Sequence, residues 1–225
     1  MYVPRHFSLP EDYARALLAN PGVGNLVTVI ASGPEATMVP FYLDEEKNAL
    51  VTHLVKNNPQ AAEPPRGPGL IILDDVDAYV PPHWYATNKV KANVPTWDYI
   101  TIHVRGAVRI DPSPEAALTA ACRLTEMMET DDVLTPVGGD QLRRMARAIV
   151  AVEVGLDEVR GKAKMSQNRH PDDIRGLADE FERHGEPRMA EFLRTVSLPY
   201  AEQRFATLAR LRGARSLGED VRSFH

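Results

Sequence analysis

The chain has 225 residues, of which 44% are hydrophobic and 25% are charged. This composition is typical of an ordinary folded domain and excludes collagen-like and intrinsically disordered chains. The net charge of −5 gives no overall attraction to nucleic acid. A single cysteine excludes a disulfide framework within the chain and favours a reducing, cytoplasmic location. No apolar run approaches the ~18 residues that a membrane span needs, so no membrane association is expected.

The first element that the sequence predicts is a helix over residues 8–19, because Ser8 and Glu11 have capping-box spacing. Tyr13, Ala16 and Leu17 are its expected core residues. Apolar and β-branched runs then predict strands over 26–31, 36–43, 49–54, 70–73, 77–80, 98–110 and 149–154.

Three details qualify these strands. The first two flank Ser32-Gly33-Pro34-Glu35, which predicts a β-hairpin. Pro40 cannot donate to a strand ladder, so the second strand is expected at an edge or at a bulge. Four prolines between residues 59 and 68 predict a loop, and Gly106 predicts a bulge in the long strand over 98–110.

Helices are predicted in the second half of the chain. Ser113-Pro114-Glu115 begins one, with Leu118, Ala121, Cys122 and Met128 toward the core. Asp140 is expected to cap a second helix, which carries Leu142, Met145 and Ala146, and everything from Pro171 onward is expected to be helical.

Strands first, with helices inserted and appended, predict an α+β fold: a small antiparallel β-barrel with a C-terminal helical tail. We expect residues 1–168 to form the barrel domain and residues 169–225 to form a helical segment packed on it.

Several kinds of chemistry have no support in the sequence. The seven histidines show no metal-ligand spacing, and Cys122 in an amphipathic helix is expected to be a small buried hydrophobe. No GxSxG, Walker A or GxGxxG motif is present. We therefore predict no catalytic residue and no metal site, and any redox chemistry would come from a cofactor.

Two segments could bind a ligand. His53 to Pro59 places a cation, Lys56, and two amides where a strand ends, an arrangement that can hold a phosphate; a solvated strand end is the alternative. Residues 79–85 and 94–99 gather aromatic side chains around Lys89, which could stack a planar heterocycle; a dimer interface or a core is the alternative.

These segments occur in an order that resembles a known family. The ordered set comprises Met1-Tyr2-Val3-Pro4, Pro40-Phe41, His53 to Pro59, Ala78-Tyr79-Val80, Trp84-Tyr85, Val94 to Trp97, His103 with Gly106, and Lys164 to Arg169. Together, over about residues 1–195, they resemble the FMN-binding negative transcriptional regulators, the PaiB family. The resemblance implies a split-barrel homodimer with FMN at the subunit interface, and a link to repression of sporulation and protease genes in some bacteria.

The two candidate segments and the family resemblance together predict the following FMN-binding residues: His53, Lys56, Asn58, Trp84, Tyr85, Lys89, Thr96, Trp97, Lys164, Gln167, Asn168 and Arg169. The sequence departs from the family pattern in the segments assigned to the flavin, at Met38, Pro81, Pro82, His83 and Asp98. A carboxylate at Asp98 would repel a phosphate unless its side chain faces away.

Other functions stay open. A flavin-dependent oxidoreductase of the pyridoxamine-phosphate oxidase type and a haem-binding split barrel are the alternatives on the same fold. Residues 200–215 carry Arg204, Arg210, Arg212 and Arg215 against Glu202, so a DNA-binding helix is a further alternative. A solvated helix face explains the same charges, and we expect no direct DNA binding.

Overall fold

The computed structural model describes the chain from Met1 to Asp220, with side chains as far as Leu211. The chain forms two compact units, which are described separately. Unit 1 comprises residues 1–3, 9–75 and 101–161, and unit 2 comprises residues 4–8, 76–100 and those from 162 onward. The boundary expected near residue 168 stays a prediction.

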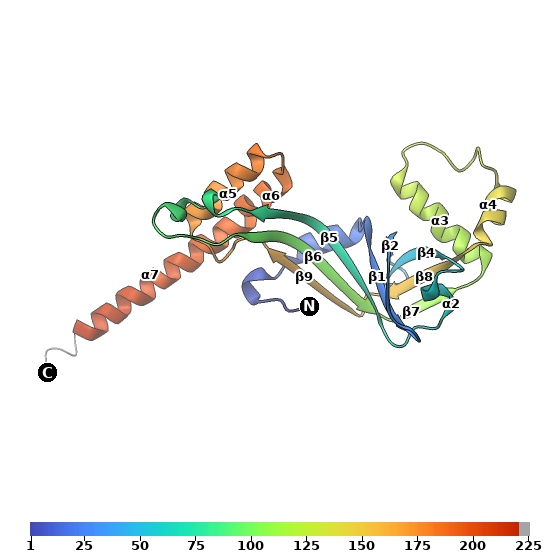
Figure 1. Cartoon of the computed structure of the whole chain (residues 1–225), viewed down its shortest axis with the longest axis horizontal. Helices are drawn as coiled ribbons and strands as arrows, with labels where there is room; N and C mark the ends of the chain where they lie inside the picture. Colours follow the sequence, from blue (N-terminus) through green and yellow to red (C-terminus); the bar gives the residue numbers. More distant parts are fainter. Residues whose placement is uncertain (221–225) are drawn as a thin grey trace. The chain divides into compact units, whose positions relative to one another are not determined.

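All the strands that pair do so in two sheets, whose elements are labelled in Figure 1. The five-stranded sheet has the order β2-β1-β5-β6-β9, and the four-stranded sheet has the order β3-β4-β8-β7. Their bounds are β1 Val23–Ile30, β2 Gly33–Pro40, β3 Tyr42–Asp44, β4 Ala49–Val55, β5 Gly69–Val80, β6 Thr96–Gly106, β7 Val108–Asp111, β8 Ile149–Gly155 and β9 Glu158–Lys164.

The helices of unit 1 are α1 Glu11–Ala19, α2 Pro59–Ala62, α3 Pro114–Met128 and α4 Gly139–Ala146. Unit 2 contains the 3₁₀ turns η1 Arg5–Phe7, η2 Pro82–Trp84 and η3 Ala86–Lys89, the helices α5 Pro171–Arg183, α6 Pro187–Phe192 and α7 Leu198–Asp220, and a π-helical turn, η4 Leu193–Ser197. In the described part of the chain no helix is both long and apolar enough to cross a membrane.

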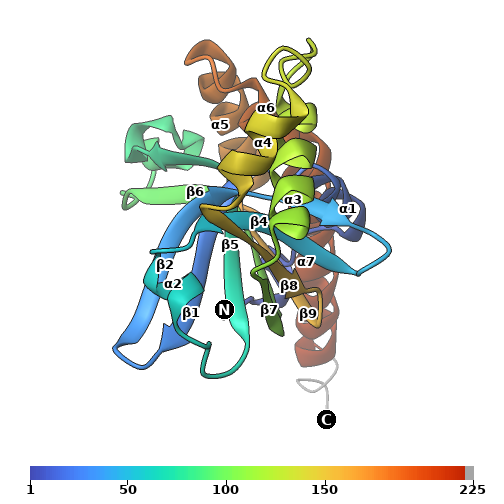
Figure 2. The same cartoon turned by 90° about the vertical axis from the view of Figure 1, so that its right-hand side faces the viewer.

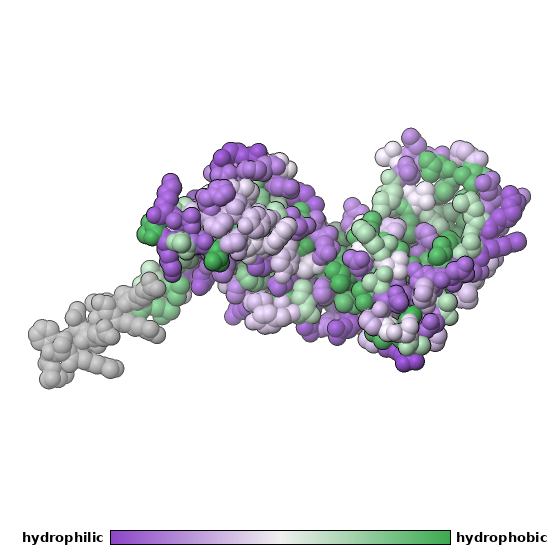
Figure 3. Space-filling view, in the orientation of Figure 1, coloured by the Kyte–Doolittle hydropathy of each residue, from purple (hydrophilic) through white to green (hydrophobic). Residues whose placement is uncertain are grey.

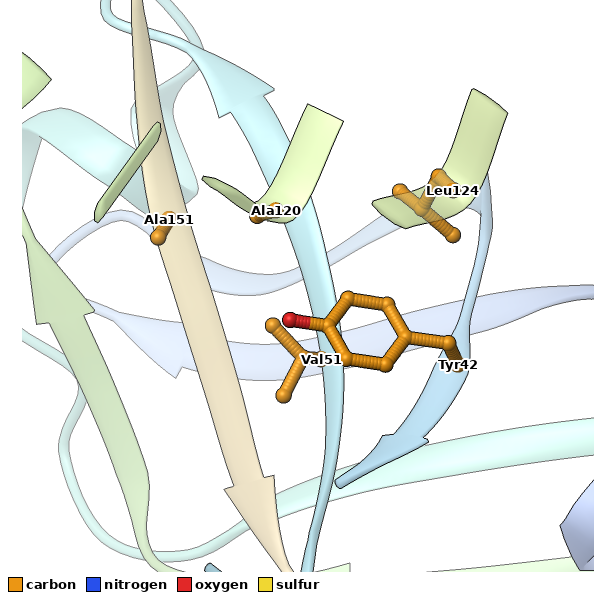
Figure 4. Close-up of a cluster of buried hydrophobic side chains, with 5 residues drawn as sticks. All are labelled: Tyr42, Val51, Ala120, Leu124 and Ala151. Carbon is orange, nitrogen blue, oxygen red and sulfur yellow. The ribbon is translucent and has the colours of Figure 1, made fainter. Parts of the chain in front are cut away.

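One buried hydrophobic cluster of unit 1 lies between the four-stranded sheet and α3. Figure 2 shows α3 and α4 side by side, and both helices contact β8. Tyr42 and Val51 face each other across β3 and β4 and pack with Ala120, Leu124 and Ala151 in a buried cluster (Figure 4). Ser113 caps α3 by accepting a hydrogen bond from the Ala116 N–H at 3.3 Å, as its position before Pro114 predicts.

The hairpin of β1 and β2 and the helix from Pro114 are confirmed. Pro40 ends β2, which is an edge strand, so its missing N–H leaves no ladder partner unsatisfied. Residues 70–80 form one continuous strand, β5, rather than two. β9 was not predicted, because its residues are mostly charged and only Ala163 in it is buried.

Four further expectations are wrong. Ser8 does not cap α1, which begins after Pro10, and no residue of α1 is buried. Residues 59–62 form α2 rather than a loop, because the Asn58 side chain accepts from the Gln60 N–H at 2.9 Å and Pro59 takes the first helical position. Asp140 lies inside α4, whose N-cap is Gly138.

The fourth concerns the face that α3 buries. Ala117, Ala120 and Leu124 are buried, whereas the expected core residues Leu118, Ala121 and Cys122 are only half-buried, and Met128 is exposed. The helix therefore packs the stripe of Ala117, Ala120 and Leu124 against the sheet, and the stripe that was expected in the core lies next to it on the helix surface.

Gly106 marks the point where the predicted long strand changes sheets. β6 belongs to the five-stranded sheet and β7 to the four-stranded one, so the expected bulge is a corner between two strands. The backbones are so close here that a Cβ at Gly106 would lie 1.8 Å from the Gly155 carbonyl oxygen. Only glycine fits this approach.

Replacing Gly106 by alanine should therefore destabilise the protein by about 3 kcal/mol or more, because the obstacle is backbone that cannot move aside. Urea unfolding followed by circular dichroism measures this change. The control is Gly139→Ala, where the nearest atom is the flexible end of Arg143 at 3.3 Å, and a change below ~1 kcal/mol is expected. Equal stability of the Gly106→Ala variant and the parent would contradict the close approach.

Candidate functional site

A partly buried group of charged and polar side chains in unit 2 surrounds the start of β6 and the segment at the end of β9. Asp98 lies at its centre and is fully buried. Its Oδ2 accepts a hydrogen bond from the Ser166 hydroxyl at 2.7 Å, and its Oδ1 has no hydrogen-bond partner among the described residues. Burial raises the pKa of Asp98 to about 6, against the opposing effects of Ser166, Lys164 and Arg169.

Lys164, at the end of β9, supplies the nearest positive charge. Its Nζ lies 3.9 Å from Asp98 Oδ1, donates to Thr96 Oγ1 at 2.5 Å and donates to the Trp97 carbonyl oxygen. Partial burial lowers the pKa of Lys164, while the Asp98 carboxylate raises it. The ammonium is still partly accessible, so it can also face a ligand.

Arg169 contributes the second cation. Its guanidinium lies over the Tyr85 ring, 4.2 Å from the ring centroid, and donates to Asn93 Oδ1 at 3.0 Å. Tyr85 is buried, and its hydroxyl has no hydrogen-bond partner among the described residues. Burial raises the pKa of Tyr85, which keeps the phenol neutral. With one carboxylate and two cations, the group has a net charge of +1 when Asp98 is ionised.

The segment from Met165 to Arg169 is held in shape by its own polar groups. Ser166 has φ of 58°, a left-handed conformation that is uncommon for a residue other than glycine. Gln167 is buried; its Oε1 accepts from the Met165 N–H at 2.9 Å, and its Nε2 donates to the Ala163 carbonyl at 2.8 Å. Gln167 therefore shapes the segment, while Asn168 is exposed.

The predicted aromatic cluster separates into a packed part and an exposed part. Trp84 packs on Phe181 and His184 of the α5 region, at ring-centroid distances of 5.4 and 4.8 Å. Trp97 is 53% exposed and meets Tyr79 edge to face at 6.0 Å. Trp97 therefore offers a large exposed surface for stacking, beside Tyr79, which is 47% exposed. Lys89 is exposed on η3.

The remaining predicted residues belong to unit 1. Lys56 is exposed just after β4 and has no ion pair in the described part of the chain. Both polar groups of the Asn58 side chain already have hydrogen-bond partners: its Oδ1 caps α2, and its Nδ2 donates to Thr37 Oγ1 at 3.0 Å. His53 is half-buried and lines an apolar cavity with α3 and α4. Burial lowers the pKa of His53, so its ring is neutral near pH 7.

The structure thus brings Tyr85, Thr96, Trp97, Lys164 and Arg169 together around Asp98. The Asp98 side chain is buried and faces inward. It therefore meets the condition, stated above, for not repelling a phosphate at the surface. Sequence reasoning missed Ser166, because its role depends on a backbone conformation that no pattern reveals. The described residues contain no group of three or more His, Cys, Asp or Glu side chains that could hold a metal ion.

Comparison with known proteins places the chain in a family. The family described as "Putative FMN-binding domain" matches residues 1–158. The chain belongs to this FMN-binding domain family. The resemblance to the PaiB family is also confirmed: over 210 residues the chain is 25% identical to the protease synthase and sporulation protein PAI 2 of Bacillus subtilis (strain 168). That match covers 86% of this chain and 96% of the relative.

Solved structures support the fold expected of this FMN-binding family. The flavocytochrome Anf3 from Azotobacter vinelandii is similar with a TM-score of 0.55 at 11% identity, covering 72% of each chain. The FAD and heme binding protein from Mycobacterium smegmatis is similar with a TM-score of 0.52 at 16% identity, covering 71% of this chain and 74% of that one. The predicted α+β split barrel with inserted helices and a C-terminal helix is confirmed.

The buried carboxylate predicts a pH dependence of stability. Since the pKa of Asp98 is raised from 3.8 to about 6 in the folded state, ionisation is harder there than in the unfolded chain. The stability that protonated Asp98 contributes to the folded state is therefore fully present below pH 4 and is lost as the pH rises through 6. The loss is about 3 kcal/mol, at about 1.4 kcal/mol per pKa unit.

Asp98→Asn should remove this part of the pH dependence, so the variant should gain stability relative to the parent between pH 4 and pH 8. Urea unfolding at several pH values measures the difference. Asp77→Asn, which changes an exposed carboxylate on β5, is the control and should give no such trend. A constant difference between the Asp98→Asn variant and the parent across this range would contradict the raised pKa.

Proposed function

We propose that this protein binds FMN and serves as a flavin redox or regulatory protein in the form of a homodimer. The observation that carries the proposal is the exposed Trp97 surface beside a net-positive polar group. The two positive charges of Lys164 and Arg169 outnumber the one negative charge of Asp98, and the Asp98 side chain is buried. A flat apolar surface next to cations fits a molecule that is both a planar heterocycle and a phosphate ester.

The residues fit FMN in their donor chemistry. Lys56, Lys164 and Arg169 are cations that can bind the phosphate or the polar edge of the ring, and Thr96 adds a hydroxyl. When bound, FMN supplies the redox chemistry, and the chain holds, orients and shields it.

The proposal does not include direct DNA binding. In α7, Arg204 donates to the Asn168 carbonyl at 3.3 Å and lies 5.8 Å from the Phe205 ring centroid. Arg212 and Arg215 lie outside the described side chains. An acidic chain with a local basic helix is expected to bind nucleic acid weakly and with steep salt dependence. The regulatory role that PAI 2 suggests would then act through the flavin or another protein.

The phosphate partner can be identified by comparing FMN with riboflavin, which lacks the phosphate. A charge-assisted hydrogen bond contributes about 1.5–3 kcal/mol, so loss of the lysine that contacts the phosphate should weaken FMN by roughly ten- to 150-fold. Riboflavin affinity should barely change. Lys56→Ala is the first variant and Lys164→Met the second, with quenching of flavin fluorescence as the readout.

Lys91→Ala is the matched control, because Lys91 is an exposed lysine outside the predicted set. Equal losses for FMN and riboflavin in one variant would indicate a damaged pocket instead of a lost phosphate contact. Failure of the parent protein to quench FMN at tens of micromolar would overturn the proposal itself.

The homodimer interface is proposed on the exposed apolar residues of unit 2, which are Val90, Val94 and Trp97. An apolar group of this kind is typical of an interface. Strand β6 is a poorer candidate at Thr101, which is buried and donates to the Leu73 carbonyl at 3.3 Å.

Light scattering should therefore give about twice the 25.0 kDa mass of one chain. Val94→Glu should shift the protein toward the monomer, because it would bury an unpaired carboxylate in the interface. Val159→Glu, at a partly exposed position of unit 1, is the control and should leave the mass unchanged. A monomeric parent at micromolar concentration would remove the proposed interface.

A further inference from the structure

Unit 1 contains an apolar cavity of about 480 Å³ that the proposed function does not use. It lies between α3, α4 and the segment that connects them, with Ile149 and His53 from the two central strands of the four-stranded sheet. Figure 3 shows hydrophobic residues reaching the surface over this part of unit 1. The cavity is about three times the size of the ~150 Å³ cavity that takes up benzene, so a two-ring molecule fits.

The cavity exists because α3 has two apolar stripes. Ala117, Ala120 and Leu124 face the sheet, and Leu118, Ala121 and Cys122 line the cavity beside them. A helix that is apolar around so much of its circumference is normally covered on both sides. Here α4 covers the second stripe incompletely, since Met145 at the cavity is 60% exposed.

The segment between α3 and α4 is folded so that it adds to the lining. Asp132 Oδ1 accepts from the N–H groups of Leu134 and Thr135 at 3.2 and 2.9 Å, which closes a local turn. This turn directs apolar residues toward the cavity: Val133, Leu134 and Val137 all line it. Val133 is 40% exposed there.

The lining defines the chemistry of the occupant. It contains no lysine, arginine, aspartate or glutamate, and burial lowers the pKa of its one histidine, His53. A charged ligand would lose its hydration without gaining a counter-charge, so the lining favours a neutral molecule. The His53 Nδ1 is buried and has no hydrogen-bond partner among the described residues, so Nε2 is the ring nitrogen that we assign to a ligand.

We infer that this cavity is a binding site for a neutral, largely apolar small molecule of about two rings, with a hydrogen-bond acceptor that meets His53 Nε2. The proton is best placed on Nε2, because an unpaired lone pair on the buried Nδ1 costs less than an unpaired N–H there. The site is distinct from the cationic flavin site proposed above.

The test uses prodan, a neutral two-ring naphthalene probe with one carbonyl, whose emission reports both the polarity around it and a hydrogen bond to that carbonyl. Saturable one-to-one binding with a blue-shifted emission is expected. The anionic probe 8-anilinonaphthalene-1-sulfonate should bind at least about tenfold more weakly, because the lining offers it no positive charge. Equal or tighter binding of the anionic probe would overturn the inference.

Ala121→Phe should fill the cavity and weaken prodan at least about tenfold. The control is Met127→Phe, which places the same side chain on the same helix at an exposed position outside the lining and should leave binding unchanged. If circular dichroism shows that Ala121→Phe does not fold, Met145→Trp, at an exposed lining position, provides the blocking variant. Unchanged prodan binding in the folded blocking variant would overturn the assignment.

Two other occupants give different results. If FMN displaces prodan from the parent protein, the cavity belongs to the flavin site and a separate ligand is excluded. If prodan does not bind and Ala121→Phe changes the mass measured by light scattering, the cavity is a contact between chains and the inference is wrong. Prodan binding by a protein that fails to bind FMN would leave this inference standing while removing the proposed function.

Discussion

The buried carboxylate of Asp98 is the constraint on which the candidate site of unit 2 depends. An ionised carboxylate without water is costly unless hydrogen bonds and opposite charges surround it. Ser166, Lys164 and Arg169 provide these, and they all come from one short segment that begins at the last residue of β9. The left-handed backbone of Ser166 is supported by the hydrogen bond from its hydroxyl to the carboxylate and by the hydrogen bonds of the Gln167 amide to the backbone of Met165 and Ala163.

This constraint also limits how strongly the site can bind an anion. Lys164 and Arg169 already interact with Asp98, so a phosphate near them would share their charge with a carboxylate that is fixed in place. Lys56 has no ion pair in the described part of the chain and would bind a phosphate without that competition. Each set of cations is therefore a candidate by itself: Lys56 of unit 1 suits a phosphate, and Lys164 with Arg169 of unit 2 suits weaker dipoles such as those of a flavin ring edge.

The sequence predicts the fold class well for two reasons. Hydrophobic residues alternate in β1 and form short continuous runs in β4 and β8, and the ordered family motifs indicate the split barrel. The sequence does not reveal which groups an individual side chain contacts in the fold. Asn58 and Gln167 were expected at a ligand, yet their amides satisfy local backbone groups, which composition cannot distinguish from ligand binding. Trp84 was expected to stack a heterocycle, but α5 packs against it, a contact between segments about 100 residues apart in the chain.

The error on α3 is informative for a different reason. Periodicity correctly identified Leu118, Ala121 and Cys122 as one apolar stripe, and the neighbouring stripe of Ala117, Ala120 and Leu124 was overlooked because small residues give a weak pattern. The sheet takes the stripe of smaller residues, since two alanines allow close approach of the helix around the Tyr42 ring (Figure 4). The stripe of Leu118, Ala121 and Cys122 is thereby left at the cavity, and α4 alone does not cover it. The sequence assigns this apolar stripe to the core, but the fold leaves it half-covered. The free energy of burying the stripe is therefore still available to an incoming molecule, and this favours a ligand site.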